Sequence, residues 1–135
     1  MAQSTQTDRT QRIREGYEAF GRGDLEAIRA QFSPDIVWHI AGNNRLSGDY
    51  KGIDAVFEFF GRIFTETDGT LKNEVHDVLA NDDHGVVLLT QSAERKGKKL
   101  SMNFVQVTHS SGDSQISESW FFPADSQAVD EFWAD

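Results

Sequence analysis

Residues 71–122, LKNEVHDVLANDDHGVVLLTQSAERKGKKLSMNFVQVTHSSGDSQISESWFF, contain four strand-like runs separated by turn-like segments. The runs are Leu71–Ala80, Val86–Glu94, Leu100–Thr108 and Gln115–Phe122. The segments between them are NDDHG at 81–85, RKGKK at 95–99 and SSGDS at 110–114. Gly, Asn, Asp and Ser at this spacing favour hairpin connections. We therefore predict a four-stranded antiparallel meander.

The chain before residue 70 has helical periodicity instead. Its apolar residues predict a helix that starts near Asp8, a second helix capped by Asp24 and a third over residues 53–67. The three apolar stripes are Ile13, Tyr17 and Phe20; Leu25, Ile28 and Phe32; and Val56, Phe57, Phe59, Phe60, Ile63 and Phe64.

The remaining segments complete the prediction of the fold. Pro34 is expected to end the second helix, and residues 36–40 to form a strand. Residues 41–52 are rich in Gly, Asn and Ser and read as a loop, and residues 126–135 as a last short helix. Helices followed by a meander predict an α+β domain with the helices on one face of a curved antiparallel sheet.

Composition excludes several classes of function. The 135 residues fit one domain, and a net charge of −9 argues against binding to nucleic acid or to an anionic membrane. The chain has no cysteine, and its four histidines have no metal-ligand spacing, so we expect neither a metal nor a cofactor. Residues 1–8 carry no apolar run, so we expect a disordered N-terminus without a signal peptide and a cytoplasmic location.

Four motifs together resemble the SnoaL-like branch of the nuclear-transport-factor-two-like superfamily. They are YEAFGRGDLEAI (17–28), DIVWHIAG (35–42), YKGIDAVFEFF (50–60) and ISESWFF (116–122). The resemblance covers residues 9–134. It implies a cone-shaped α+β barrel, a deep apolar pocket between the helices and the sheet, and a homodimer.

The catalytic residues of that superfamily correspond only in part to residues of this chain. The tyrosine of the steroid isomerases falls one residue before Tyr17, and their base falls on Ile40, beside His39. Their second carboxyl falls near Gln106. The polyketide cyclases have an aspartate near the last-strand tryptophan, where this chain offers Trp120 and Glu118.

His39 and Tyr17 are the candidate catalytic residues, and each has two interpretations. If Ile40 occupies the base position, as the resemblance implies, strand alternation places Trp38 toward the pocket with Ile40 and His39 away from it, although a bulge would reverse this. His39 is therefore either a structural histidine or a pocket base. Tyr17 is either a core aromatic or a hydroxyl that binds a carbonyl or phenol oxygen in the cavity.

We expect Tyr17, Trp38, Gln106 and Trp120 to line one apolar cavity, with Glu118 as either a buried acid or a solvated residue. Two functions stay open. One is acid–base isomerisation, cyclisation or hydrolysis of a hydrophobic, carbonyl-bearing small molecule. The other is a noncatalytic small-molecule-binding or dimeric interaction domain. Because Ile40 replaces the base, efficient steroid isomerisation is not expected.

Overall fold

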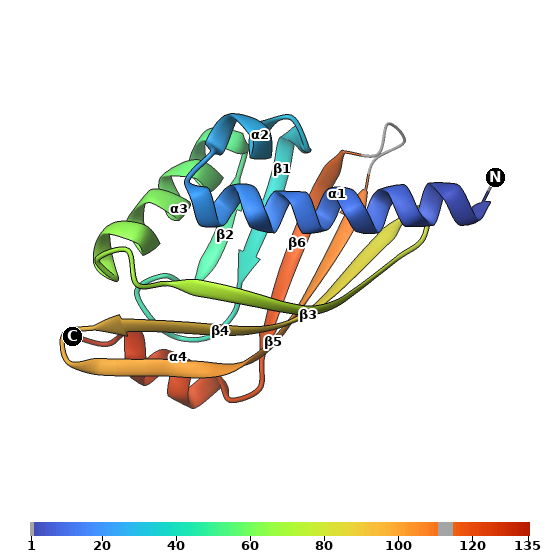
Figure 1. Ribbon diagram of the computed structural model, residues 1–135. Coiled ribbons are helices and arrows are strands. Elements are labelled where there is room, and N and C mark those ends of the chain that lie inside the picture. The colour runs from blue at the N-terminus through green and yellow to red at the C-terminus, as the bar shows by residue number, and fades with distance from the viewer. Residues whose placement is uncertain (1, 111–114) are drawn as a thin grey trace.

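The computed structural model describes residues 2–110 and 115–135, with side chains from Asp8 onward. Figure 1 shows a curved sheet with α1 lying across one of its faces. The helices are α1 (Ala2–Arg22), α2 (Leu25–Arg29), α3 (Ile53–Glu66) and α4 (Ser126–Trp133). The strands are β1 (Phe32–Ile40), β2 (Gly48–Lys51), β3 (Lys72–Ala80), β4 (His84–Arg95), β5 (Lys98–Ser110) and β6 (Ile116–Pro123).

The predicted meander is confirmed and is part of a larger sheet. The six strands lie in the order β2-β1-β6-β5-β4-β3. The pair β1–β6 is parallel and the other pairs are antiparallel, so the sheet is mixed. β2 lies inside the segment that we expected to be a loop, because four residues are too few to give an alternating pattern. The α+β class is confirmed.

The helix boundaries differ from the prediction at two places. α1 begins at Ala2, although we expected disorder through residue 8. No Gly or Pro interrupts residues 2–8, so a polar extension of the amphipathic helix is sterically allowed. α2 ends at Arg29 and β1 begins at Phe32, before Pro34. Residues 111–114 of the third predicted turn lie outside the described residues.

The core lies between the helices and one face of the sheet. Asp24 caps α2 as predicted, since its Oδ1 accepts from the backbone N–H of Ala27 at 3.2 Å. α3 buries four apolar side chains, Val56, Phe59, Phe60 and Ile63. Along the described chain, no helix combines the length and apolarity needed to cross a membrane.

Gly85 allows α1 to approach the sheet closely. A Cβ atom at this position would lie 2.7 Å from Thr108 Oγ1 and 2.8 Å from Ile13 Cδ1. Both distances are shorter than non-bonded atoms tolerate, so the missing side chain leaves the room that Ile13 of α1 and Thr108 of β5 occupy.

Candidate functional site

A cavity of about 140 Å³ lies between the helices and the inner face of the sheet. Residues from all four helices and from five of the six strands contribute to its wall. Nine of the lining side chains are aromatic, namely Tyr17, Phe20, Phe32, Trp38, Phe59, Phe60, Phe104, Phe121 and Trp133. The large phenylalanine content of the sequence is therefore concentrated around this space.

The cavity wall carries no charged side chain among the residues that the structure describes. Its polar members are amides and hydroxyls, and several are already paired. Gln31 Nε2 donates to the Arg12 carbonyl at 2.8 Å, and Gln91 Nε2 donates to Asn73 Oδ1 at 2.9 Å. These pairs satisfy the buried polar groups without placing a formal charge in the cavity.

One hydrogen-bonded chain runs from the cavity into the sheet. The Tyr17 hydroxyl on α1 donates to Gln106 Oε1 on β5, and Gln106 Nε2 donates to Ser119 Oγ on β6 at 2.9 Å. Tyr17 and Gln106 line the cavity, and Ser119 is fully buried behind them. Burial raises the pKa of Tyr17 well above its ordinary value, so the phenol stays protonated.

Trp38 lies at the centre of the aromatic wall. Its ring contacts Phe32, Phe60 and Phe121 at centroid distances of 5.6, 5.2 and 5.6 Å. The indole is 6% exposed, and its Nε1 has no hydrogen-bond acceptor among the described residues. The alternation predicted for β1 is thus correct, because Trp38 and Ile40 both line the cavity.

His39 lies on the opposite face of the sheet, so its candidacy as a pocket base is wrong in this structure. Its ring nitrogens lie 2.7 Å from Asp49 Oδ1 and 2.7 Å from Glu118 Oε2, and its ring stacks on Trp120 at 5.2 Å. Desolvation lowers the pKa of His39, but the hydrogen bonds and charges of Glu118 and Asp49 outweigh it and raise the pKa overall.

Trp120 and Glu118 are also outside the cavity, which contradicts the expectation for Trp120 and agrees with the solvated alternative for Glu118; β6 contains a bulge just before them. His109 pairs with Glu118 while Ser110 pairs with Ile116, so Ser117 is an extra residue in β6. The extra residue reverses the alternation. Ile116 therefore lines the cavity together with Phe121, whereas Trp120 points to the other side.

The structure thus brings Tyr17, Trp38 and Gln106 together and separates Trp120 from them. The sequence analysis missed Phe121, which fills the place we gave to Trp120, and Ser119, which supports Gln106. The run Trp120-Phe121-Phe122 offers a large aromatic residue on either face, so composition alone gives no signal for the choice.

Helix α4 closes one end of the cavity with Val129 and Trp133. Two contacts hold it to the loop after β1. Asp130 Oδ1 accepts from the backbone N–H of Asn43 at 2.9 Å and from Asn44 Nδ2 at 2.8 Å. Because α4 is tied to this loop, two distant segments of the chain form one wall.

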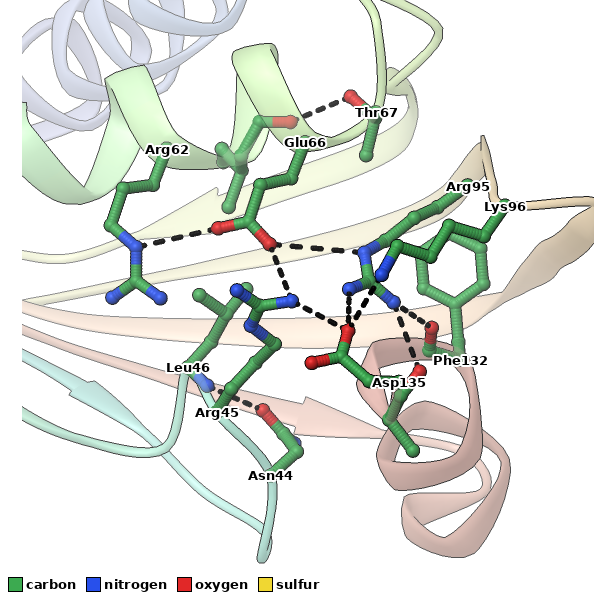
Figure 2. Close-up of polar contacts among 12 residues, drawn as sticks. Asn44, Arg45, Leu46, Arg62, Glu66, Thr67, Arg95, Lys96, Phe132 and Asp135 are labelled. Carbon is green, nitrogen blue, oxygen red and sulfur yellow. Dashed lines mark hydrogen bonds and ion pairs between the residues drawn. The ribbon is translucent and has the colours of Figure 1, made fainter.

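Figure 2 shows the ion-pair network at the C-terminal end of α4. Arg95 has a buried side chain and donates to the carbonyls of Phe132 and Ala134 at 3.2 and 3.0 Å. Its Nη2 lies 2.6 Å from Asp135 Oδ1, and its Nε lies 3.8 Å from Glu66 Oε1. Cations here complement the free carbonyls and the dipole of the helix.

Asp135 is the acceptor shared by three cations of this network. Its Oδ1 lies 3.0 Å from Lys96 Nζ and 2.9 Å from Arg45 Nη1, in addition to its contact with Arg95. The hydrogen bonds from Lys96 and Arg95 and the charge of Arg45 lower the pKa of Asp135 to about 2. The side chain stays ionised at every pH at which the chain is expected to work.

A family model described as a SnoaL-like domain matches residues 13–119. An uncharacterized protein of Mycobacterium tuberculosis is 34% identical over 125 residues, which cover 90% of this chain and 93% of that protein. Bal32a, from a soil-derived mobile gene cassette, superposes with a TM-score of 0.89 at 34% identity, over 93% of this chain and 95% of Bal32a. TerC, co-crystallized with polyporic acid, has a TM-score of 0.79 at 21% identity, over 92% and 96% of the two chains.

Proposed function

Since this chain belongs to the SnoaL-like family, we propose that it binds a neutral, largely apolar small molecule in the cavity between the helices and the sheet. The observation that carries the proposal is the wall itself, which is rich in aromatic side chains and free of charge along the described residues. Small-molecule sites commonly combine an apolar wall with a few polar anchors.

The size and the neutrality of the cavity limit its occupant. A dry cavity of about 150 Å³ can hold a molecule of the size of benzene, so the space here suits a group of about one ring. An anionic ligand would lose its hydration without gaining a cation, and that cost is large. The likeness to TerC supports small-molecule binding by this fold, since TerC was crystallized with polyporic acid, whereas the limits on charge and size come from the wall of this cavity alone.

The same wall favours binding over acid–base catalysis. Proton abstraction requires a group whose pKa lies near the working pH, and the wall offers no carboxylate or imidazole among the described residues. Tyr17 has a raised pKa and cannot serve as a base near neutral pH. Of the two functions left open by the sequence, we therefore propose the noncatalytic one.

Titration with three one-ring probes tests the proposal. We expect α-methylstyrene and acetophenone, which are neutral, to shift NMR signals of cavity residues in a saturable way. Benzoate has a similar size but carries a charge, and we expect it to bind at least about tenfold more weakly because its carboxylate would be desolvated without a partner. Equal or tighter binding of benzoate would contradict the proposal.

We also propose a homodimer that forms through the uncovered face of the sheet. Seven apolar side chains form an outer patch on two rows of cross-strand neighbours: Leu79, Val86, Val107 and Trp120 in one row, and Leu88, Val105 and Phe122 in the other. None of them joins the buried core, and Leu79, Leu88 and Phe122 are 52%, 37% and 51% exposed. An apolar centre with a polar rim is typical of protein interfaces.

The rim of the outer patch supports this assembly. The next row of neighbours on one side is His84, His109 and Glu118, which are polar. On the other side lie Thr90 and Asn103, which also pair with each other across the strands. In a twofold dimer the same patch of each copy meets its counterpart, and an apolar patch with a polar rim suits such a contact.

A further inference from the structure

We infer that Ser119 decides the direction of the hydrogen bonds in the Tyr17–Gln106–Ser119 chain, and thereby lets the cavity donate a proton to an acceptor on the ligand. The inference rests on the proposed function, because it concerns what the cavity offers to a bound molecule. Only Tyr17 and Gln106 reach the cavity, so Ser119 would act as a positioning residue behind them.

In one direction, the chain leaves a donor without a partner in the protein interior. Tyr17 donates to Gln106 Oε1, and Gln106 Nε2 donates to Ser119 Oγ at 2.9 Å. Ser119 then acts as an acceptor, and its own hydroxyl proton needs another partner. The side chain is 0% exposed, and no second hydrogen bond involves it within the described part of the chain. A buried donor without a partner costs free energy.

The opposite direction moves the unpaired donor from the buried Ser119 to the cavity wall. Turning the Gln106 amide over exchanges its oxygen and nitrogen at nearly the same positions. Ser119 then donates to Gln106 Oε1, and Gln106 Nε2 donates to the Tyr17 oxygen. The proton left over is that of the Tyr17 hydroxyl, which lies at the cavity wall.

A ligand selects between the two directions. A neutral molecule with a carbonyl or ether oxygen accepts the Tyr17 proton, and every donor in the chain then has a partner. A hydrocarbon offers no acceptor for the Tyr17 proton, so its binding does not favour the reversed direction of the hydrogen bonds. If the Ser119 hydroxyl is absent, Tyr17 is the only donor left for Gln106 Oε1. The Tyr17 hydroxyl then keeps its hydrogen bond to Gln106 and does not donate to the ligand.

A pair of matched probes tests this inference. Acetophenone and α-methylstyrene have nearly the same shape and differ in C=O against C=CH2. We expect Ser119→Ala to lower the affinity for acetophenone about fivefold to tenfold, the range of one neutral hydrogen bond, and to leave the affinity for α-methylstyrene unchanged. Adding Gln106→Met to Ser119→Ala should restore acetophenone binding, because the amide that holds the Tyr17 proton is then gone.

The outcomes separate this inference from the proposed function. If Ser119→Ala leaves the ratio of the two affinities unchanged, or if the double variant does not restore it, the inference is overturned, although the binding of α-methylstyrene still supports the proposed function. If neither probe binds the wild type, the proposed function is overturned, and the inference with it.

A measurement on the wild type covers the case in which Ser119→Ala unfolds. The side-chain amide NMR signals of Gln106 should move when acetophenone binds, because both hydrogen-bond partners of the amide change roles. α-Methylstyrene should leave them near their free positions. If both probes shift the Gln106 amide signals of the wild type equally, the inference is overturned, and no variant is needed for that conclusion.

Discussion

The cavity on the inner side of the sheet and the outer face of the sheet differ in the ionisable groups that they hold, although the same strands supply both. The inner face carries amides, hydroxyls and one indole, and no charge among its described cavity residues. The outer face holds His39 between two carboxylates and exposes the outer patch. The inner face is thus suited to a neutral ligand, and the outer face to a protein surface.

Trp38 and His39 give the sharpest form of this comparison, because they are neighbours in β1 on opposite faces. We expect Trp38→Ala to lower the free energy of unfolding by about 3–5 kcal/mol, since a large buried aromatic leaves a cavity. His39→Ala removes a partly exposed ion pair and should cost about 1 kcal/mol or less. Chemical denaturation of both variants measures the difference, and equal losses would mean that the two faces are equally buried.

The next largest effect concerns the outer patch. We expect the wild type to be a dimer at micromolar concentration and Phe122→Asp to be a monomer, because a desolvated carboxylate would lie in the interface of each copy. Light scattering after size exclusion measures both states. Ser101→Asp, on the same face beyond the patch, is the matched control and should remain dimeric. A monomeric wild type would refute the dimer.

Tyr17, which lines the cavity, and Tyr50, which does not, allow a matched test of the ligand contact. Tyr17→Phe should lower the affinity for acetophenone about fivefold to tenfold, because one hydrogen bond to the ligand is lost. Tyr50→Phe serves as the control, since the Tyr50 hydroxyl donates to the Leu46 carbonyl at 2.7 Å and does not line the cavity. If Tyr17→Phe binds acetophenone as tightly as Tyr50→Phe does, the Tyr17 hydroxyl does not hydrogen-bond to the ligand.

The smallest expected effect is the pH dependence that His39 adds to stability. A group whose pKa is raised by folding stabilises the protein below its ordinary value of 6.5, and that contribution is lost as the pH rises through the folded value. The free energy of unfolding should therefore decline somewhat above pH 6.5 in the wild type, and less in His39→Gln. Denaturation curves across this range test the sign, and a rise in the wild type would contradict it.

The prediction of which side chains share a face of the sheet was correct where a strand alternates regularly and wrong where a strand contains a bulge. Residues 36–40 alternate without interruption, so period two placed Trp38 and His39 on opposite faces, and the family resemblance indicated which of the two faces the pocket. In β6 the extra residue Ser117 breaks the alternation, and no pattern in the sequence announces it. Period two would place Trp120 on the same face as Ile116, and the bulge puts the two side chains on opposite faces.

Long-range contacts set a second limit on the prediction. Tyr17 and Gln106 were each recognised as candidates, yet their hydrogen bond joins residues 89 positions apart. It depends on how α1 lies across the sheet, which helical periodicity does not specify. Ser119 was missed because a serine in a strand is commonplace until its neighbour is known.

The close approach of α1 to β4 at Gly85 has a consequence for how ligand size could change in relatives of this protein. The helix that carries Tyr17 rests on the sheet where a side chain is missing. A single methyl group there would force the Ile13 and Thr108 side chains to move, and both of them line the cavity. The shape of the binding site thus depends on a residue outside its wall, so an alanine at position 85 would alter the site without itself touching the ligand.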